Sequence, residues 1–289
     1  MNKKKKSRWN LLPGVEPTTM DLKIIEAQEH GKLVPTRDLI KTQKQIEGIR
    51  KAGILNTAVL DYVAEHIKEG MSTLEIDKLV YDFTTKHGGV PAPLNYCGFP
   101  NSCCTSINDV VCHGIPCDWE ILEDGDIINV DCTTIVDGYY ADASRMFIIG
   151  NAEPEAKRLV QVAWDCLKIG EKVCEQPYVY VGDTAKEITR LAHENGCSVV
   201  RDYCGHGVGV EFHEDPEMEH YGKKSRTGML LVPGMTFTIE PMINLGDYEC
   251  CNDEEDETGW IVLTEDGSLS AQWEHTYLMT ENGVEILSH

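Results

Sequence analysis

The sequence predicts a mixed α/β fold built from two similar halves, each with two helices followed by strands. Two stretches with helical spacing of apolar residues occur in each half, and stretches with strand-like alternation follow both pairs. An Asp-Gly pair at 137–138 separates two alternating stretches, which is typical of a tight antiparallel hairpin. The composition is that of a globular protein, with 42% apolar and 26% charged residues.

The first half begins with a predicted helix from Gln43 to Lys68, where apolar residues recur every three or four positions and Gly70 ends the pattern. A second helix follows it. Ser72 and Glu75 have the spacing of a capping box, and the apolar stripe continues to the glycine pair at 88–89. The first half therefore supplies two amphipathic helices before its long strands.

The second half repeats this order. Residues Glu155–Ile169 predict a helix that Gly170 ends. Thr184 and Glu187 have capping-box spacing, which predicts a further helix from there to Gly196. An internal duplication is the simplest explanation of the repeated order.

The strands are predicted from alternating residues bounded by turn residues. The hairpin strands cover 126–136 and 139–149, and the further candidates are Met235–Glu240, Trp260–Leu263 and Ser268–Met279. Residues 245–258 form an acidic stretch between strands. We expect this stretch to be a solvated surface loop.

Residues 1–40 differ in composition from the rest and predict a basic, loosely docked extension ahead of one domain at 41–289. Lys3–Lys6 open the extension, three prolines interrupt it, and only 20–30 has a helical pattern. No apolar stretch of signal-peptide length follows the lysines. Two interpretations of the lysines stay open: contact with ribosomal RNA or another acidic partner, or a solubilising tail.

The charge and the cysteines exclude several classes of protein. The net charge is −22, with 26 Lys and Arg against 48 Asp and Glu, so we expect no DNA partner. No apolar run reaches the roughly 18 residues that span a bilayer, so we expect no membrane partner. The twelve cysteines include no pair of CxxC motifs. We therefore expect reduced thiols in a cytoplasmic protein rather than a zinc ribbon.

The hairpin register brings two carboxylates to one face of the sheet. With the Asp-Gly pair as the turn, Thr133 lies opposite Asp142, and Asp131 lies opposite Ser144. Asp131 and Asp142 are then diagonal neighbours, about 7–8 Å apart at Cα, and can converge on a cation. The alternative is a solvent-exposed polar face of an antiparallel sheet.

Three further side chains are candidates to join this pair. His206 lies among three glycines, which permit close approach of the backbone and make it a better ligand candidate than an isolated histidine. Glu240 lies late in a predicted strand, and Glu274 lies in the last one. His275 is expected on the face opposite Glu274. No role is assigned to the histidines at 30, 66, 87, 193, 220 and 289.

Five segments together resemble the signature of type I methionine aminopeptidases: NVDCTTIVDGYYADASRMF, YCGHGVG, FHEDP, TIEPM and AQWEHT. The match runs from about residue 40 to the C-terminus. The resemblance implies the pita-bread fold of peptidase family M24, in which two pseudo-symmetric halves share a central antiparallel sheet flanked by helices. It also implies removal of the N-terminal methionine from nascent proteins by dinuclear metal-assisted hydrolysis. We expect a small second residue in the substrate and a monomeric enzyme.

The resemblance also assigns roles to residues. The metal ligands it implies are Asp131, Asp142, His206, Glu240 and Glu274, and two of them, Asp142 and Glu274, match positions that bridge two ions. His113 and His213 match two substrate-contacting histidines, which would stabilise the tetrahedral intermediate. Glu240 is the candidate for moving the proton. The wall of the methionine pocket is expected from Pro93, Tyr96, Phe99, Cys104, Tyr203, Phe212 and Trp260.

The ligand chemistry fits two divalent ions. Four carboxylates brought together repel one another and have raised pKa values unless cations compensate them. Two divalent cations supply four positive charges. One imidazole with four carboxylates suits Mn²⁺, Fe²⁺ or Co²⁺ better than a thiolate-rich zinc site would. The sequence leaves the choice among Co, Mn and Fe open.

Several alternatives stand beside this hypothesis. A prolidase or aminopeptidase P would share the ligands but carry a large N-terminal domain, and only about 40 residues precede the match. A catalytically inactive module of this fold would lose ligands, whereas all five are present. His213 could be a surface histidine kept charged by acidic neighbours, and the pocket aromatics could be core residues. The interval from His206 to Glu240 has no long insertion, which favours type I over type II enzymes.

Overall fold

The structure is a computed structural model in which residues 9–11 and 14–289 are described, so Lys3–Lys6 lie outside the described residues. The helices are α1 (Thr19–Glu29), α2 (Gln43–His66), α3 (Thr73–Lys86), α4 (Pro154–Val173) and α5 (Val181–Glu194), and short 3-10 turns are η1 (Arg37–Leu39) and η2 (Tyr96–Gly98). The strands are β1 (Val90–Pro91), β2 (Cys104–Ile107), β3 (Val110–Cys112), β4 (Ile127–Val136), β5 (Tyr139–Ile148), β6 (Ser198–Val199), β7 (Gly205–Gly207), β8 (Glu214–Met218), β9 (Thr236–Ile239), β10 (Met242–Asn244), β11 (Cys250–Asn252), β12 (Val262–Thr264), β13 (Ser270–Gln272), β14 (Glu274–Thr280) and β15 (Gly283–Ser288).

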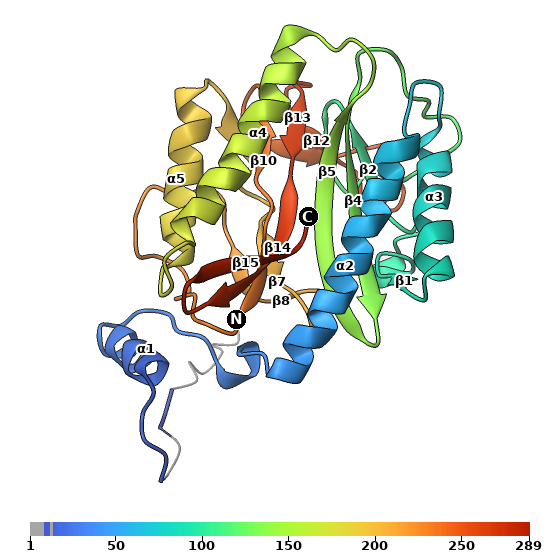
Figure 1. Cartoon of the computed structure of the whole chain (residues 1–289). Helices are drawn as coiled ribbons and strands as arrows, with labels where there is room; N and C mark the ends of the chain where they lie inside the picture. Colours follow the sequence, from blue (N-terminus) through green and yellow to red (C-terminus); the bar gives the residue numbers. More distant parts are fainter. Residues whose placement is uncertain (1–8, 12–13) are drawn as a thin grey trace.

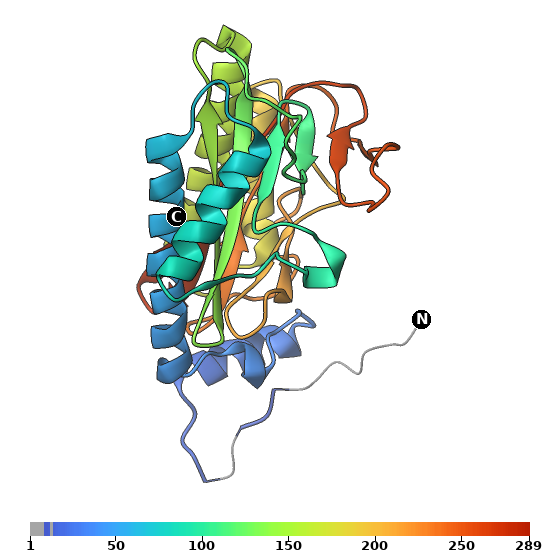
Figure 2. The same ribbon diagram turned by 90° about the vertical axis from the view of Figure 1, so that its right-hand side faces the viewer.

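A nine-stranded antiparallel sheet connects the two halves of the chain. Its main path is β1-β4-β5-β14-β9-β7-β8, while β2 pairs with β4 and β15 pairs with β14. Figure 1 shows α2 and α3 over one half of this sheet and α4 and α5 over the other half. Figure 2 shows the β11–β12 hairpin projecting from the side opposite α2. The helices therefore cover one face and leave the other face for the site.

The helices of the first half begin where the sequence predicts them. At the start of α3, Ser72 N donates to Glu75 Oε2 at 2.9 Å and Glu75 N donates to Ser72 Oγ at 3.2 Å, which confirms the capping box. Helix α2 covers Gln43–His66, against the predicted 43–68. The side chains that these helices bury against the sheet include Val59, Leu60 and Ile76.

Two predicted helix boundaries in the second half were wrong. Helix α5 begins at Val181, and Thr184 lies in its first turn, where its hydroxyl donates to Val181 O at 2.6 Å instead of capping the helix. Asp183 caps it, because Asp183 Oδ2 accepts from Tyr180 N at 2.9 Å. Helix α4 continues through Gly170. A Cβ at Gly170 would lie 3.1 Å from a methyl of Ile239, so this glycine permits close packing rather than ending the helix.

The β4–β5 hairpin has the predicted register. Val136 pairs with Tyr139 across the turn, and the pairing continues for ten residues without a shift. Asp137 and Gly138 have φ values of 51° and 82°, the left-handed conformation that a two-residue hairpin turn requires at both central positions. This register places Asp131 opposite Ser144 and Thr133 opposite Asp142, as predicted.

The last predicted strands are divided differently from the prediction. Residues 268–279 form two strands that meet at Trp273: β13 pairs with β10 in a small sheet, and β14 pairs with β5 and β9 in the large one. The strand expected at Trp260–Leu263 begins two residues later. The acidic stretch at 245–258 is not only a loop, because Cys250–Asn252 pairs with β12.

The extension ahead of the domain packs on the core at several points. Trp9, Ile24 and Leu39 are 5%, 0% and 6% exposed and belong to the same buried cluster as the apolar face of α4. These side chains are more fully buried than we expected of a loosely docked extension. The division of the chain into an extension and a domain at residue 40 stays a prediction. Among the described residues, no helix combines the length and the apolar character that crossing a bilayer requires.

Candidate metal centre

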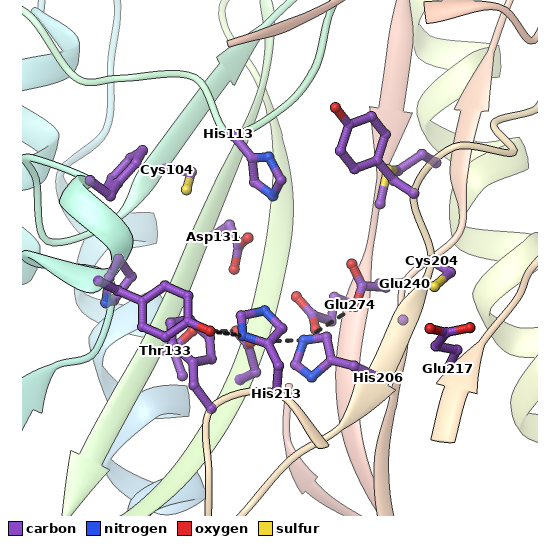
Figure 3. A pocket seen from close by; sticks show the side chains of 18 of the residues that line it. Cys104, His113, Asp131, Thr133, Cys204, His206, His213, Glu217, Glu240 and Glu274 are labelled. Atoms are coloured by element: carbon purple, nitrogen blue, oxygen red, sulfur yellow. Dashed lines mark hydrogen bonds and ion pairs between the residues drawn. The ribbon is translucent and has the colours of Figure 1, made fainter. Parts of the chain in front are cut away.

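Five adjacent strands each bring one predicted ligand to a single cavity of about 600 Å³. In the order of the sheet, these residues are Asp131 on β4, Asp142 on β5, Glu274 on β14, Glu240 directly after β9 and His206 on β7. Ser144 pairs with both Asp131 and Glu274, so the latter two lie in one row across the sheet. Figure 3 shows Asp131, His206, Glu240 and Glu274 directed toward a common space.

Three of these side chains have the spacing of a metal site. One ligand atom each of Asp142, His206 and Glu274 lies within 4.8 Å of the other two. His206 Nε2 is 3.6 Å from Asp142 Oδ2 and 3.7 Å from Glu240 Oε1. Asp131 also lines the cavity, on the far side of the hairpin from His206.

Because these carboxylates are buried close together, their ionised forms are energetically unfavourable without a cation. Burial raises the pKa of Asp131 to about 7 and the pKa of Glu240 to about 8. Burial and then the neighbouring carboxylates raise the pKa values of Asp142 and Glu274 well above their usual range. Among the described residues, no hydrogen-bond partner reaches the buried Asp131 Oδ1 or Glu274 Oε1. The donor set therefore fits divalent cations, which would pair these oxygens and neutralise the charges.

Neighbouring polar groups orient two of the predicted ligands, Asp142 and Glu240. Thr133 Oγ1 donates to Asp142 Oδ1 at 2.8 Å. Thr238 Oγ1 and Gln272 Nε2 donate to the two oxygens of Glu240 at 2.7 and 3.0 Å. Such partners fix the direction of ligand lone pairs in metal sites.

His206 has the tautomer that a metal ligand needs. Its Nδ1 lies 2.9 Å from the carbonyl oxygen of Gly207, and since a carbonyl only accepts, Nδ1 carries the proton. The unprotonated Nε2 then faces Asp142 and Glu240. Burial lowers the pKa of His206 to about 3, which keeps the ring neutral.

The two predicted substrate histidines line the same cavity. His113 lies against Tyr203 and Trp260, each with a ring-centroid distance of 5.5 Å, and burial lowers its pKa to about 4. The His213 ring is 4.2 Å from the His206 ring, and His213 Nδ1 is 3.0 Å from Tyr96 Oη. Burial also lowers the pKa of His213. His213 is nevertheless exposed to solvent, as the alternative of a surface histidine assumed, whereas its lowered pKa disfavours the charged form that this alternative also assumed.

The predicted pocket residues all line this cavity: Pro93, Tyr96, Phe99, Cys104, Tyr203, Phe212 and Trp260. Phe99 and Cys104 are buried, and the Phe99 ring meets the Trp260 ring edge-on at 5.5 Å. His275 lies on the other face of β14 from Glu274, with its ring 5.7 Å from the Trp164 ring, as expected.

The sequence interpretation missed three residues of the site. Met242 lines the cavity and is buried. His220, to which no role was assigned, accepts the backbone N–H of Glu240 on its Nε2 at 3.1 Å. Lys41 pairs with Glu214, which also lines the cavity. The position of Met242 directly after the Glu240-Pro241 pair could have indicated it. No local sequence pattern connects His220 or Lys41 to the predicted ligands.

Comparisons with known proteins agree with this geometry. The family model described as metallopeptidase family M24 matches residues 47–281. Methionine aminopeptidase A from Synechocystis sp. is 48% identical over 247 residues, which cover 86% of this chain and 96% of that protein. The crystal structure of methionine aminopeptidase from Rickettsia prowazekii has a TM-score of 0.82 at 46% identity, covering 86% of this chain and 99% of that one. The structure from Thermotoga maritima has a TM-score of 0.83 at 38% identity, with coverages of 86% and 98%.

The predicted pita-bread fold is confirmed by these structural similarities. The family match spans most of the chain and includes all five predicted ligands. The chain belongs to the metallopeptidase family M24.

Proposed function

We propose that this chain is a methionine aminopeptidase that hydrolyses the first peptide bond of polypeptides beginning with methionine. The observation that supports this most strongly is the convergence of one imidazole, four carboxylates and two further histidines on one cavity with an apolar wall. The relatives compared above carry the same name at 38–48% identity.

The metal-binding part of the proposal is a pair of divalent ions. Asp131, Asp142, His206, Glu240 and Glu274 would hold them, with Asp142 and Glu274 shared between the two. Two divalent ions would balance the four carboxylates, and Mn²⁺, Fe²⁺ and Co²⁺ suit this oxygen-rich set. Bound ions would lower the pKa of a water molecule, polarise the scissile carbonyl and orient the substrate.

Glu240 is the residue that would hold the proton that the reaction moves. Burial raises its pKa to about 8 in the absence of cations, which supports this role because the carboxyl group then takes a proton near neutral pH. Thr238 and Gln272 fix both of its oxygens, so the carboxyl group has a defined direction. A positioned carboxyl group of this kind can act as a general base and then as a general acid.

The two histidines that line the cavity would contact the scissile amide. Burial lowers the pKa values of both rings, which favours the neutral form with one N–H donor each. When Tyr96 donates to His213 Nδ1, the proton of the His213 ring is on Nε2 and is free for the substrate. Such a donor stabilises the tetrahedral intermediate by about 3–4 kcal/mol.

The apolar wall explains the preference for methionine. Phe99, Cys104, Met242 and Trp260 supply polarisable carbon and sulfur to the cavity. A pocket of this kind distinguishes one methylene by about 1–3 kcal/mol, so discrimination against an unbranched analogue such as norleucine would be modest. A small second residue in the substrate is part of the proposal through the resemblance to type I enzymes.

An assay with two tripeptides tests the function. The metal-free protein is reconstituted separately with Mn²⁺, Fe²⁺, Co²⁺ and Zn²⁺ and is given Met-Ala-Ser or Met-Leu-Ser. We expect release of methionine, faster from the alanine peptide. Release from neither peptide with any of the metals would refute the proposed function.

A further inference from the structure

A buried ion pair connects the start of α2 to the loop that carries His213. Lys41 Nζ donates to Glu214 Oε2, although 173 positions separate the two residues. Their side chains are only 1% and 9% exposed. Removing one member of such a pair leaves the other charge buried without compensation, so the two residues depend on each other.

Glu214 uses its other oxygen to hold its own loop. Glu214 Oε1 accepts the backbone N–H groups of Val210 at 2.7 Å and Glu211 at 3.0 Å. These hydrogen bonds join Glu214 to the start of the segment 210–214 and fix the backbone that carries Phe212 and His213. If this carboxylate turned away, both amides would lose their acceptor and the segment that carries Phe212 and His213 would lose a constraint.

Lys41 is fixed at the other end of the pair. Its backbone N–H donates to Gly234 O at 2.8 Å, and Gly234 precedes β9, the strand that Glu240 directly follows. Thr42, the next residue, caps α2 by accepting from Gln45 N. Lys41 therefore connects the His213 loop to the strand that carries a proposed metal ligand.

The loop held in this way contributes directly to the cavity. The Phe212 ring is 4.7 Å from the Tyr96 ring and the His213 ring is 4.2 Å from the His206 ring. Figure 3 shows His213 beside His206, at the edge of the space that the carboxylates face. A small displacement of the loop would move the proposed donor away from the reacting carbonyl.

We propose that Lys41 is a positioning residue for the reaction, acting through Glu214 to hold His213 against the metal centre. This inference rests on the function proposed above. Lys41→Met keeps the length and apolar volume of the side chain and removes its charge. It is expected to lower kcat by about ten- to a hundredfold, because a misplacement of about 1 Å in a catalytic group has an effect of that size. KM should change less than about threefold, since the pocket aromatics other than Phe212 lie outside the loop.

Two measurements distinguish positioning from general loss of structure. The first is the double variant Lys41→Met with His213→Ala in the metal-loaded full-length chain. If Lys41 acts through His213, Lys41→Met should lower kcat by less than about twofold once His213 is absent. The second is amide hydrogen exchange, which Lys41→Met should accelerate at Val210 and Glu211 but not in β4 and β5. Lys44→Met, an exposed lysine in the first turn of α2, is the matched control and should behave like the parent.

The outcomes separate this inference from the proposed function. A parent chain that releases no methionine refutes the function, and the exchange measurement then still tests the positioning. Parental kcat in Lys41→Met, or an equal loss with and without His213, would overturn the inference. If Lys41→Met does not fold, Lys41→Met/Glu214→Gln, which removes both buried charges, replaces it in the same comparisons.

Discussion

Replacing Glu240 by glutamine should stabilise the metal-free protein, and the gain should grow with pH. Burial raises the pKa of Glu240 from 4.5 to about 8, so the folded chain keeps a proton that the unfolded chain loses. The stability associated with this proton is complete below pH 4.5 and is lost as the pH rises through about 8. Each unit of pH in that window costs about 1.4 kcal/mol, so the loss between pH 5.5 and pH 8.5 is about 3 kcal/mol.

Urea unfolding in the presence of a chelator measures this effect. The unfolding free energy of Glu240→Gln relative to the parent should increase by about 3 kcal/mol between pH 5.5 and pH 8.5, because glutamine does not ionise. Glu240 also raises the pKa values of Asp142 and Glu274, so these fall in the variant and change the difference in the same direction. Glu65→Gln, at an exposed position on α2, is the control and should show no such trend. A difference that stays constant with pH would refute the description of this site as a buried, uncompensated carboxylate cluster.

Three further predictions follow from the same site. Asp142→Asn and Glu274→Gln should each abolish methionine release and lower the metal content measured by atomic emission; parental turnover with two bound ions would contradict their shared roles. The affinity for Mn²⁺, measured by calorimetry, should rise between pH 6 and pH 8, since Asp131, with a pKa of about 7, must lose its proton to bind an ion; an affinity independent of pH would contradict this. Deleting residues 1–12 should reduce co-sedimentation with ribosomes at low salt if the lysines contact ribosomal RNA, and unchanged binding would remove that interpretation.

The convergence of Asp131 and Asp142 on one cavity could be predicted because short-range signals determine the register of the strands that carry them. The Asp137-Gly138 turn adopts positive φ at both positions, and the pairing of β4 with β5 follows from it. His206, Glu240 and Glu274 were found through sequence segments typical of a family. The structure then brings all of these residues to neighbouring strands.

The features that could not be predicted depend on tertiary contacts. Gly170 reads as a helix stop, yet it lies inside α4 because Ile188 and Ile239 pack against it. Thr184 has capping-box spacing, yet its hydroxyl bonds within the helix. The Lys41–Glu214 pair and the contact of His220 with Glu240 N join segments that no periodicity relates.

The most direct test of the metal centre is the crystal structure of the Mn²⁺-loaded protein with anomalous diffraction data. Two anomalous peaks are expected in the cavity, with carboxylate oxygens of Asp142 and Glu274 within about 2.5 Å of both ions and His206 Nε2 within that distance of one. Manganese bound elsewhere, or Asp131 and His206 turned away from the ions, would contradict the account.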